Sequence, residues 1–190
     1  KHLRKKYNAK SRHLEILFLG RTSEKSNFNV LLEALIYINL DNITLNVIGN
    51  DEHCSLNTHK SILKNKININ WHGKLINEKE ISNIANKCRL FVYPGAVGLS
   101  LIHAMAYGLP CIVHSNRLKH MPEIAAFKPG KTGFVFNPDD PKDLAIKLSS
   151  LITDPTSLNY MSNNCLSIIK NQFNITSMTK NFVKFIREFN

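Results

Sequence analysis

The sequence predicts an α/β fold: a Rossmann-like, doubly wound parallel sheet of about six strands, followed by C-terminal helices. Short apolar or β-branched runs alternate with amphipathic segments along most of the chain. Several runs, such as Ile43–Ile48, are almost continuously apolar, which is typical of strands buried on both faces. After Pro155 the apolar residues recur only at three- and four-residue spacing, and this spacing indicates helices.

The predicted elements follow one another with short connections. Strands are expected at residues 14–19, 43–48, 67–72, 89–93, 110–114 and 133–136. Helices are expected at residues 28–39, 57–64, 78–86, 99–107 and 142–152, with two more after Pro155. The second of these late helices carries apolar residues between Phe182 and Phe189. We divide the chain into a linker or partial helix at residues 1–13 and one domain at residues 14–190.

Composition limits the classes of function. The chain has 190 residues, which suits one compact domain, and a formal net charge of +11. A basic chain can bind nucleic acid, an anionic membrane or an anionic small substrate. The Lys and Arg residues are scattered and the aromatics fall at core-like positions, so we expect no nucleic-acid binding. A solvated basic surface explains the charge equally well, and residues 2–6 could meet lipid headgroups or form a solvated linker.

The sequence gives no sign of a metal centre or a membrane span. Its four cysteines form no CxxC pair, which argues against a zinc site and a disulfide framework and favours the cytoplasm. No apolar run approaches the roughly 18 residues that a spanning helix needs. Attachment at the inner face of a membrane remains an alternative to a free cytoplasmic location. We expect no cofactor and no metal.

The most informative stretch is residues 93–110, which combines a strand end, a glycine-bearing loop and a helix start. Gly95 and Gly98 allow a tight turn, and a helix is expected to begin near Gly98 to Ser100. The free N–H groups and positive dipole of a helix start bind anions, and in open α/β sheets they lie beyond the carboxyl ends of the strands. The stretch therefore predicts a phosphate site.

Residues 98–113 resemble the donor-site segment of the GT-B glycosyltransferases of family 4, which are retaining, use nucleotide-sugars and need no metal. Two other segments resemble the same family in order and spacing. Residues 17–25, Leu-Phe-Leu-Gly-Arg-Thr-Ser-Glu-Lys, match its early strand with Gly-Arg and Lys, and residues 131–144 match its late strand, proline turn and helix. The resemblance implies one half of a GT-B fold, the C-terminal nucleotide-sugar-binding domain.

The resemblance also implies roles for particular residues. Arg21 and Lys25 would hold the donor diphosphate, so they are our candidate catalytic residues, although the family has one residue more between them. The candidate substrate-binding residues are Gly20, Leu75, Gly95, Val97, Gly98, Leu99, Ser100 and His103. Leu75 is placed where the family's backbone meets the nucleobase. The acceptor, a glycan or a lipid-linked sugar, would be bound by an N-terminal half preceding residue 1, and the 190 residues alone would be inactive.

Two departures from the family's pattern matter. The family has two glutamates, one facing the transferred sugar and one facing the ribose, and those positions hold Gly95 and His103 here. His103 could still hydrogen-bond ribose hydroxyls through a ring nitrogen, whereas Gly95 leaves sugar contacts to main-chain N–H groups near Val97 to Ser100. A noncatalytic binding or scaffold domain of the same fold therefore stays open, as does, more remotely, a nucleic-acid-binding protein.

Overall fold

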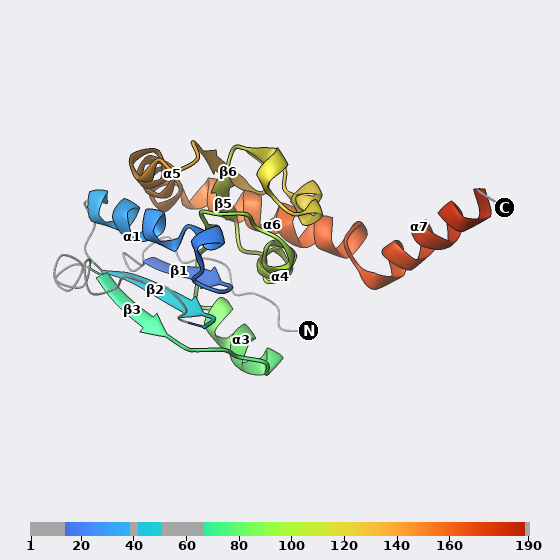
Figure 1. Cartoon of the computed structure of the whole chain (residues 1–190), viewed down its shortest axis with the longest axis horizontal. Coiled ribbons are helices and arrows are strands. Elements are labelled where there is room, and N and C mark those ends of the chain that lie inside the picture. The colour runs from blue at the N-terminus through green and yellow to red at the C-terminus, as the bar shows by residue number, and fades with distance from the viewer. Residues whose placement is uncertain (1–13, 39–41, 51–66, 189–190) are drawn as a thin grey trace.

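The computed structural model describes residues 14–38, 42–50 and 67–188. Its strands form one parallel sheet in the order β3-β2-β1-β4-β5-β6 (Figure 1). Their bounds are β1 Leu14–Leu19, β2 Ile43–Ile48, β3 Ile67–Trp71, β4 Leu90–Tyr93, β5 Cys111–His114 and β6 Gly133–Phe136. The six-stranded, Rossmann-like sheet predicted from the sequence is confirmed. The expected helix at 57–64 and the expected linker at 1–13 lie outside the described residues.

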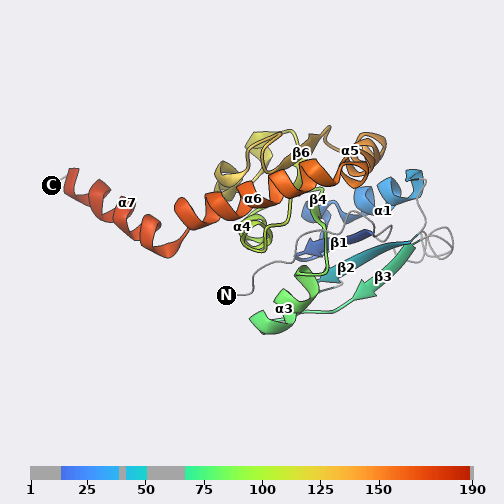
Figure 2. The same cartoon turned by 180° about the vertical axis from the view of Figure 1, so that it is seen from behind.

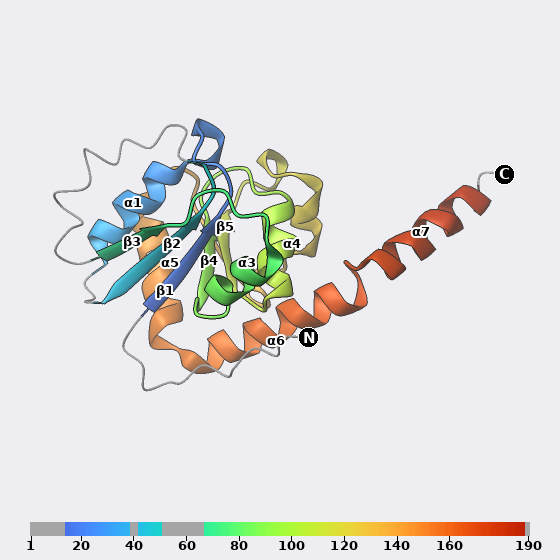
Figure 3. The ribbon, with the colours of Figure 1, turned by 90° about the horizontal axis from the view of Figure 1, so that it is seen from below.

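Helices cover both faces of the sheet. α1 (Phe28–Tyr37) and α5 (Pro141–Thr153) pack on one face, and α3 (Glu78–Ala85) and α4 (Leu99–Ala106) lie on the other (Figure 3). β1 shows why two cores form. Ile16 and Phe18 point into the apolar cluster that β1 shares with α1 and α5, the first cluster, whereas Leu17 between them points into the cluster shared with α3 and α4, the second cluster. The almost continuous apolar strands of the sequence are the consequence of this double burial.

Short polar side chains fix where several helices begin. Asn77 accepts a hydrogen bond from the Lys79 amide at the start of α3, and Asp140 accepts from the amides of Lys142 and Asp143 at the start of α5. Asp154 does the same for α6 (Pro155–Asn171). Each cap satisfies amides that have no partner inside the helix.

α7 (Ile175–Glu188) is unlike the other helices because none of its residues is buried. It extends away from the layered part of the molecule in every view (Figure 2). Its apolar side chains are open to solvent: Ile175, Met178, Phe182, Val183, Phe185 and Ile186. The apolar residues that the sequence places from Phe182 onward are therefore exposed in the described part of the helix. Across the described ranges, no helix is both long and apolar enough to span a bilayer.

The strand order creates a crevice between β1 and β4. From β1 the chain moves outward through β2 to β3, and it then returns to place β4 on the other side of β1. The loops after β1 and β4 therefore diverge to opposite faces of the sheet, and ligands of open α/β folds bind at such a switch point, beyond the carboxyl ends of the strands.

Candidate functional site

The carboxyl end of β1 is held rigidly against its neighbours. The Gly20 amide donates to the Ile48 carbonyl at 2.9 Å, and the buried Thr22 hydroxyl donates to the Asn50 carbonyl at 3.0 Å. Gly20 has φ +149°, and a Cβ there would lie 2.9 Å from the Tyr93 ring. Only glycine fits this turn without strain. The turn places Arg21, whose side chain is exposed, at the opening of the crevice.

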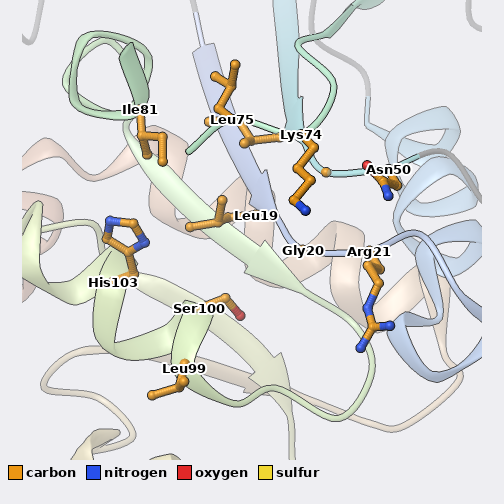
Figure 4. Close-up of a pocket in the computed structure, with 12 residues that line it drawn as sticks. Leu19, Gly20, Arg21, Asn50, Lys74, Leu75, Ile81, Leu99, Ser100 and His103 are labelled. Carbon is orange, nitrogen blue, oxygen red and sulfur yellow. The ribbon is translucent and has the colours of Figure 1, made fainter. Parts of the chain in front are cut away.

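A cavity of about 610 Å³, the large cavity, occupies the carboxyl edge of β1, β2 and β3. Figure 4 shows Arg21, Lys74 and Asn50 at one end of it, and His103 and Ile81 at the other. Six of the predicted site residues line it: Gly20, Arg21, Leu75, Leu99, Ser100 and His103. One end is therefore cationic, and the rest combines apolar walls with an imidazole.

The start of α4 forms one side of the large cavity through Leu99 and Ser100. Gly98 is the N-cap, and its carbonyl accepts from the Leu101 amide at 2.9 Å. The first amides of a helix have no intrahelical acceptor, so this end carries the positive pole of the helix dipole. Glu123 lies close by: one of its carboxylate oxygens is buried with no hydrogen-bond partner among the described residues, 3.7 Å from where a Gly98 Cβ would be.

His103 is held by two neighbours at the other end of the large cavity. Its Nε2 lies 3.1 Å from a Glu78 carboxylate oxygen and 3.1 Å from the Tyr107 hydroxyl, and that hydroxyl also donates to Glu78. Burial acts to raise the pKa of Glu78, but hydrogen bonds from Tyr107 and His103 bring it below its usual value. Burial and the Glu78 charge raise the pKa of Tyr107. A carboxylate only accepts, so Nε2 of His103 carries a proton.

Val97 does not present its amide to a ligand. Its side chain is fully buried, and its N–H donates to Nδ1 of His120 at 3.2 Å. The Nε2 of His120 in turn donates to the His114 carbonyl at 2.9 Å, so both of its ring nitrogens are used. Burial lowers the pKa of His120, which keeps the ring neutral, as this pattern of one donated and one accepted bond requires. The expectation that the Val97 amide contacts a sugar does not fit this arrangement.

Lys25 and Gly95 lie together, but outside the large cavity. Both line a separate cavity of about 390 Å³, the His114 cavity, at the carboxyl ends of β4, β5 and β6. A third one, the bridging cavity, is lined by Arg21, Ser23, Glu24 and Lys25. The structure thus brings Arg21 together with the start of α4, whereas Lys25 joins that group only through the bridging cavity.

Sequence reasoning missed several residues that line the large cavity. Lys74 and Asn50 follow β3 and β2, and Lys74 supplies the second cation of the large cavity. Their position directly after two predicted strands was the signal that could have found them. The sequence does suggest His114, at the end of a predicted strand, as a candidate for contact with the donor sugar, and in the structure it ends β5, is 5% exposed and lines the His114 cavity. In the described part of the chain, no group of three His, Cys, Asp or Glu side chains is arranged to hold a metal ion.

Comparisons with known proteins agree with this architecture. The family model for glycosyl transferases group 1 matches residues 1–166. The "Uncharacterized 41.2 kDa protein in cps region" of Klebsiella pneumoniae is 24% identical over 181 residues, which are 93% of this chain and 47% of that protein.

Solved structures show the same fold. Sucrose-phosphate synthase from Thermosynechococcus elongatus has a TM-score of 0.75 at 19% identity, covering 96% of this chain and 46% of that one. HepE from Anabaena, solved in complex with UDP, has a TM-score of 0.74 at 16% identity, covering 93% and 49%. The chain spans about half the length of these relatives. Because the family model covers most of the sequence, the chain belongs to the glycosyl transferases group 1 family.

Proposed function

We propose that this chain is the nucleotide-sugar-binding half of a retaining glycosyltransferase that transfers a sugar to a glycan or a lipid-linked acceptor. The observation that carries the proposal is that Arg21 lines one cavity with Leu99 and Ser100 at the start of α4. A guanidinium and free helix amides that face the same space are suited to a diphosphate. Membership of the family supports the proposal, as does the UDP bound in the related HepE structure.

The cationic end of the large cavity would stabilise the departing nucleoside diphosphate. As the glycosidic bond breaks, negative charge grows on the diphosphate, and fixed positive groups stabilise that charge more strongly in the transition state than in the ground state. Arg21 and Lys74 are the cations that line this end, and Lys25 shares the adjoining bridging cavity with Arg21. With protein cations in this role, no metal and no other cofactor is needed.

The other end of the large cavity suits a nucleoside. Leu75 and Ile81 provide apolar walls for a base, and His103 provides a polar group for ribose hydroxyls. Because Nε2 of His103 donates toward Glu78 and Tyr107, Nδ1 is the ring nitrogen left to contact a ribose hydroxyl, at the position of the family's second glutamate.

The remaining parts of the proposal concern the parent protein. An N-terminal half would bind the acceptor and close the cleft, and the enzyme would work in the cytoplasm, free or at the inner face of the membrane. A noncatalytic binding domain is the second candidate. One observation favours it: Gly95, at the position of the family's sugar-facing glutamate, has a backbone carbonyl where a side chain would lie.

Calorimetry on the 190-residue chain tests nucleotide binding directly. UDP, GDP and ADP are titrated into the wild type, Arg21→Ala and the control Lys128→Ala, which replaces an exposed lysine that lines a different cavity. We expect one diphosphate to bind saturably, Arg21→Ala to weaken it about 10- to 100-fold, and Lys128→Ala to leave it unchanged. No saturable binding of any of the three diphosphates would contradict the proposal. The noncatalytic alternative predicts binding without transfer when the acceptor half is supplied.

A further inference from the structure

Two positions of the loop between β4 and α4 that were expected to contact the transferred sugar offer no group for it. Gly95 has no side chain, and the Val97 amide is occupied by His120. If a nucleotide-sugar binds in the large cavity, other groups next to the diphosphate must hold its sugar. The inference that follows rests on the proposed function and concerns a site that lies beyond Lys25.

The His114 cavity is the nearest candidate because Lys25 lines both it and the bridging cavity, and Arg21 lines both the bridging cavity and the large cavity. The three cavities therefore follow one another along the carboxyl edge of the sheet. The volume of the His114 cavity, about 390 Å³, lies within the roughly 300–1,000 Å³ of small-molecule sites.

The His114 cavity is built around a buried imidazole. His114 is 5% exposed, and its ring stacks on the His120 ring with centroids 3.8 Å apart. His120 is itself fixed by the Val97 amide and the His114 carbonyl. Elsewhere in the lining, the side-chain amide of Asn27 donates to the Asp139 carboxylate and so joins the start of α1 to the loop after β6. The walls are therefore set before any ligand arrives.

The proton of His114 can be placed by its surroundings. Nδ1 is sealed from solvent and has no hydrogen-bond partner among the described residues. Burial, together with His120 and Lys119, lowers the pKa of His114 to about 4, so the ring is neutral near pH 7. An unpaired buried acceptor is tolerated better than an unpaired buried N–H. Nδ1 is therefore left without a proton, and Nε2 carries the donor.

The charges around the His114 cavity balance. Two lysines, Lys25 and Lys119, and two carboxylates, Glu24 and Asp139, line the cavity together with the neutral imidazole of His114. An anion would meet two carboxylates there, and a cation would meet two ammonium groups. A hexose is neutral and offers hydroxyls that donate and accept in turn, which matches such a lining.

We propose that the His114 cavity binds the sugar of the nucleotide-sugar donor, with Nε2 of His114 donating to a sugar hydroxyl and Lys119 and Asp139 contacting others. In this arrangement the nucleoside lies in the large cavity, the diphosphate lies at the cationic end of that cavity beside Arg21 and Lys74, and Lys25 lies between the diphosphate and the sugar. His114 is then a specificity-determining residue for the sugar, and it has no part in binding the nucleotide.

The test compares UDP with UDP-glucose, and GDP with GDP-mannose, by calorimetry on the wild type, His114→Leu, His114→Gln, Lys119→Ala and the control Lys128→Ala. We expect the nucleotide-sugar that fits to bind about tenfold more tightly than its diphosphate in the wild type and in Lys128→Ala. His114→Leu should reduce that ratio to threefold or less, on the order of one lost hydrogen bond, and leave diphosphate affinity unchanged. His114→Gln, which keeps a donor, should restore part of the ratio.

The outcomes separate the two proposals. If no diphosphate and no nucleotide-sugar binds the wild type, the proposed function fails, and this inference fails with it. If a diphosphate binds but the ratio is near one, or is unaffected by His114→Leu and Lys119→Ala, only the sugar site is overturned. Lys119 is exposed, so Lys119→Ala should fold even if His114→Leu does not. The ratio of nucleotide-sugar affinity to diphosphate affinity in Lys119→Ala then decides whether the sugar site stands. Circular dichroism establishes which variants are folded.

Discussion

The carbonyl oxygen of Lys25 lies where a side chain on Gly95 would have to be. A Cβ on Gly95 would be 2.0 Å from that oxygen and 2.6 Å from the Ser26 carbonyl carbon. The same oxygen accepts a hydrogen bond from the Ala96 amide at 3.1 Å. The turn after β1 and the loop after β4 are therefore held together by backbone contact. This contact lies at the switch point of the sheet, where β1 and β4 are neighbours.

The first prediction concerns the stability of this contact. Gly95→Ala should lower the free energy of unfolding by about 3 kcal/mol, at the upper end for overpacking, because the obstructing atoms are backbone and cannot turn aside. Gly73→Ala is the control: a Cβ there meets nothing within 4 Å, and only its left-handed φ of +66° costs roughly 1 kcal/mol. Urea unfolding measures both. Equal losses of unfolding free energy in Gly95→Ala and Gly73→Ala would show that the loop after β4 moves to make room for the added methyl group.

The second prediction separates the two lysines. Lys74 shares the large cavity with Arg21, whereas Lys25 reaches Arg21 only in the bridging cavity. Lys74→Ala should weaken diphosphate binding about tenfold, and Lys25→Ala by less, since a closer cation contributes more to holding the anion. Lys79→Ala, an exposed lysine on α3, serves as the control. Titrating the diphosphate that binds into each of the three variants, at constant ionic strength, ranks the variants by affinity. A larger loss for Lys25→Ala would restore the assignment made from the sequence.

Much of the fold could be predicted because it depends on local patterns. Double burial makes Ile43–Ile48 almost continuously apolar, and the capping residues and prolines place the helix starts. The expected strand at 110–114 begins at Cys111, one residue later, and the helix expected at 142–152 begins at Pro141 and ends at Thr153. Such shifts affect only the ends of an element, because the hydrophobic pattern along its interior is the same with either set of bounds.

The site was predicted only in part because it depends on contacts distant in sequence. Arg21, Leu99 and Ser100 could be grouped, since strand ends and helix starts meet at the switch point. The hydrogen bond from the Val97 amide to His120 joins residues 23 positions apart, and neither segment contains a sequence pattern that predicts it. Lys74 and His114 each follow or end a strand, but their cavities are defined by backbone that the sequence alone does not position.

The third prediction concerns His103 and its two partners. Under the proposed function, His103→Ala should weaken UDP binding about tenfold and weaken binding of 2′,3′-dideoxy-UDP far less, because only UDP offers ribose hydroxyls. Glu78→Gln should also weaken UDP binding, but by less, because it removes the carboxylate that keeps the proton of His103 on Nε2. Glu80→Gln, two residues along α3, is the matched control. Equal losses for both ligands would place His103 away from the ribose.

The fourth prediction follows from the buried histidine of β5. The pKa of His114 is about 4 in the folded chain, against an ordinary value of 6.5, because burial, His120 and Lys119 disfavour the charged ring while Asp139 opposes them. Between pH 6.5 and pH 4 the unfolded chain takes up a proton that the folded chain does not. The stability from this group is therefore complete above about pH 6.5 and is lost as the pH falls toward 4.

The measurement is the melting temperature as a function of pH. The wild type should melt at progressively lower temperature on acidification through this window, and His114→Gln should show a shallower decline. His72 and His120, whose pKa values are also lowered by burial, contribute in the same direction and leave a residual slope. A variant with the wild-type slope would show that His114 titrates normally in the folded chain.

The fifth prediction concerns α7. Its side chains are all at least partly exposed, with Phe182 at 65% and Phe185 at 58%, so its apolar face contributes little to the core described here. The last apolar contact before it is Phe173, which packs on the second cluster. A chain ending at Asn174 keeps that contact. Its melting temperature should therefore stay within about 2 °C of the longer chain, since removing exposed residues usually changes stability by under about 0.5 kcal/mol.

Light scattering provides the second readout for the same pair of chains. An exposed apolar stripe of this kind promotes association at high concentration, so the shorter chain should stay monomeric at concentrations where the longer one self-associates. Phe182→Ser together with Phe185→Ser, in the full chain, should match the shorter chain in both measurements. A fall of several degrees on truncation would instead mean that α7 packs on the sheet layers in solution, because only contact with the core could make an exposed helix stabilise it.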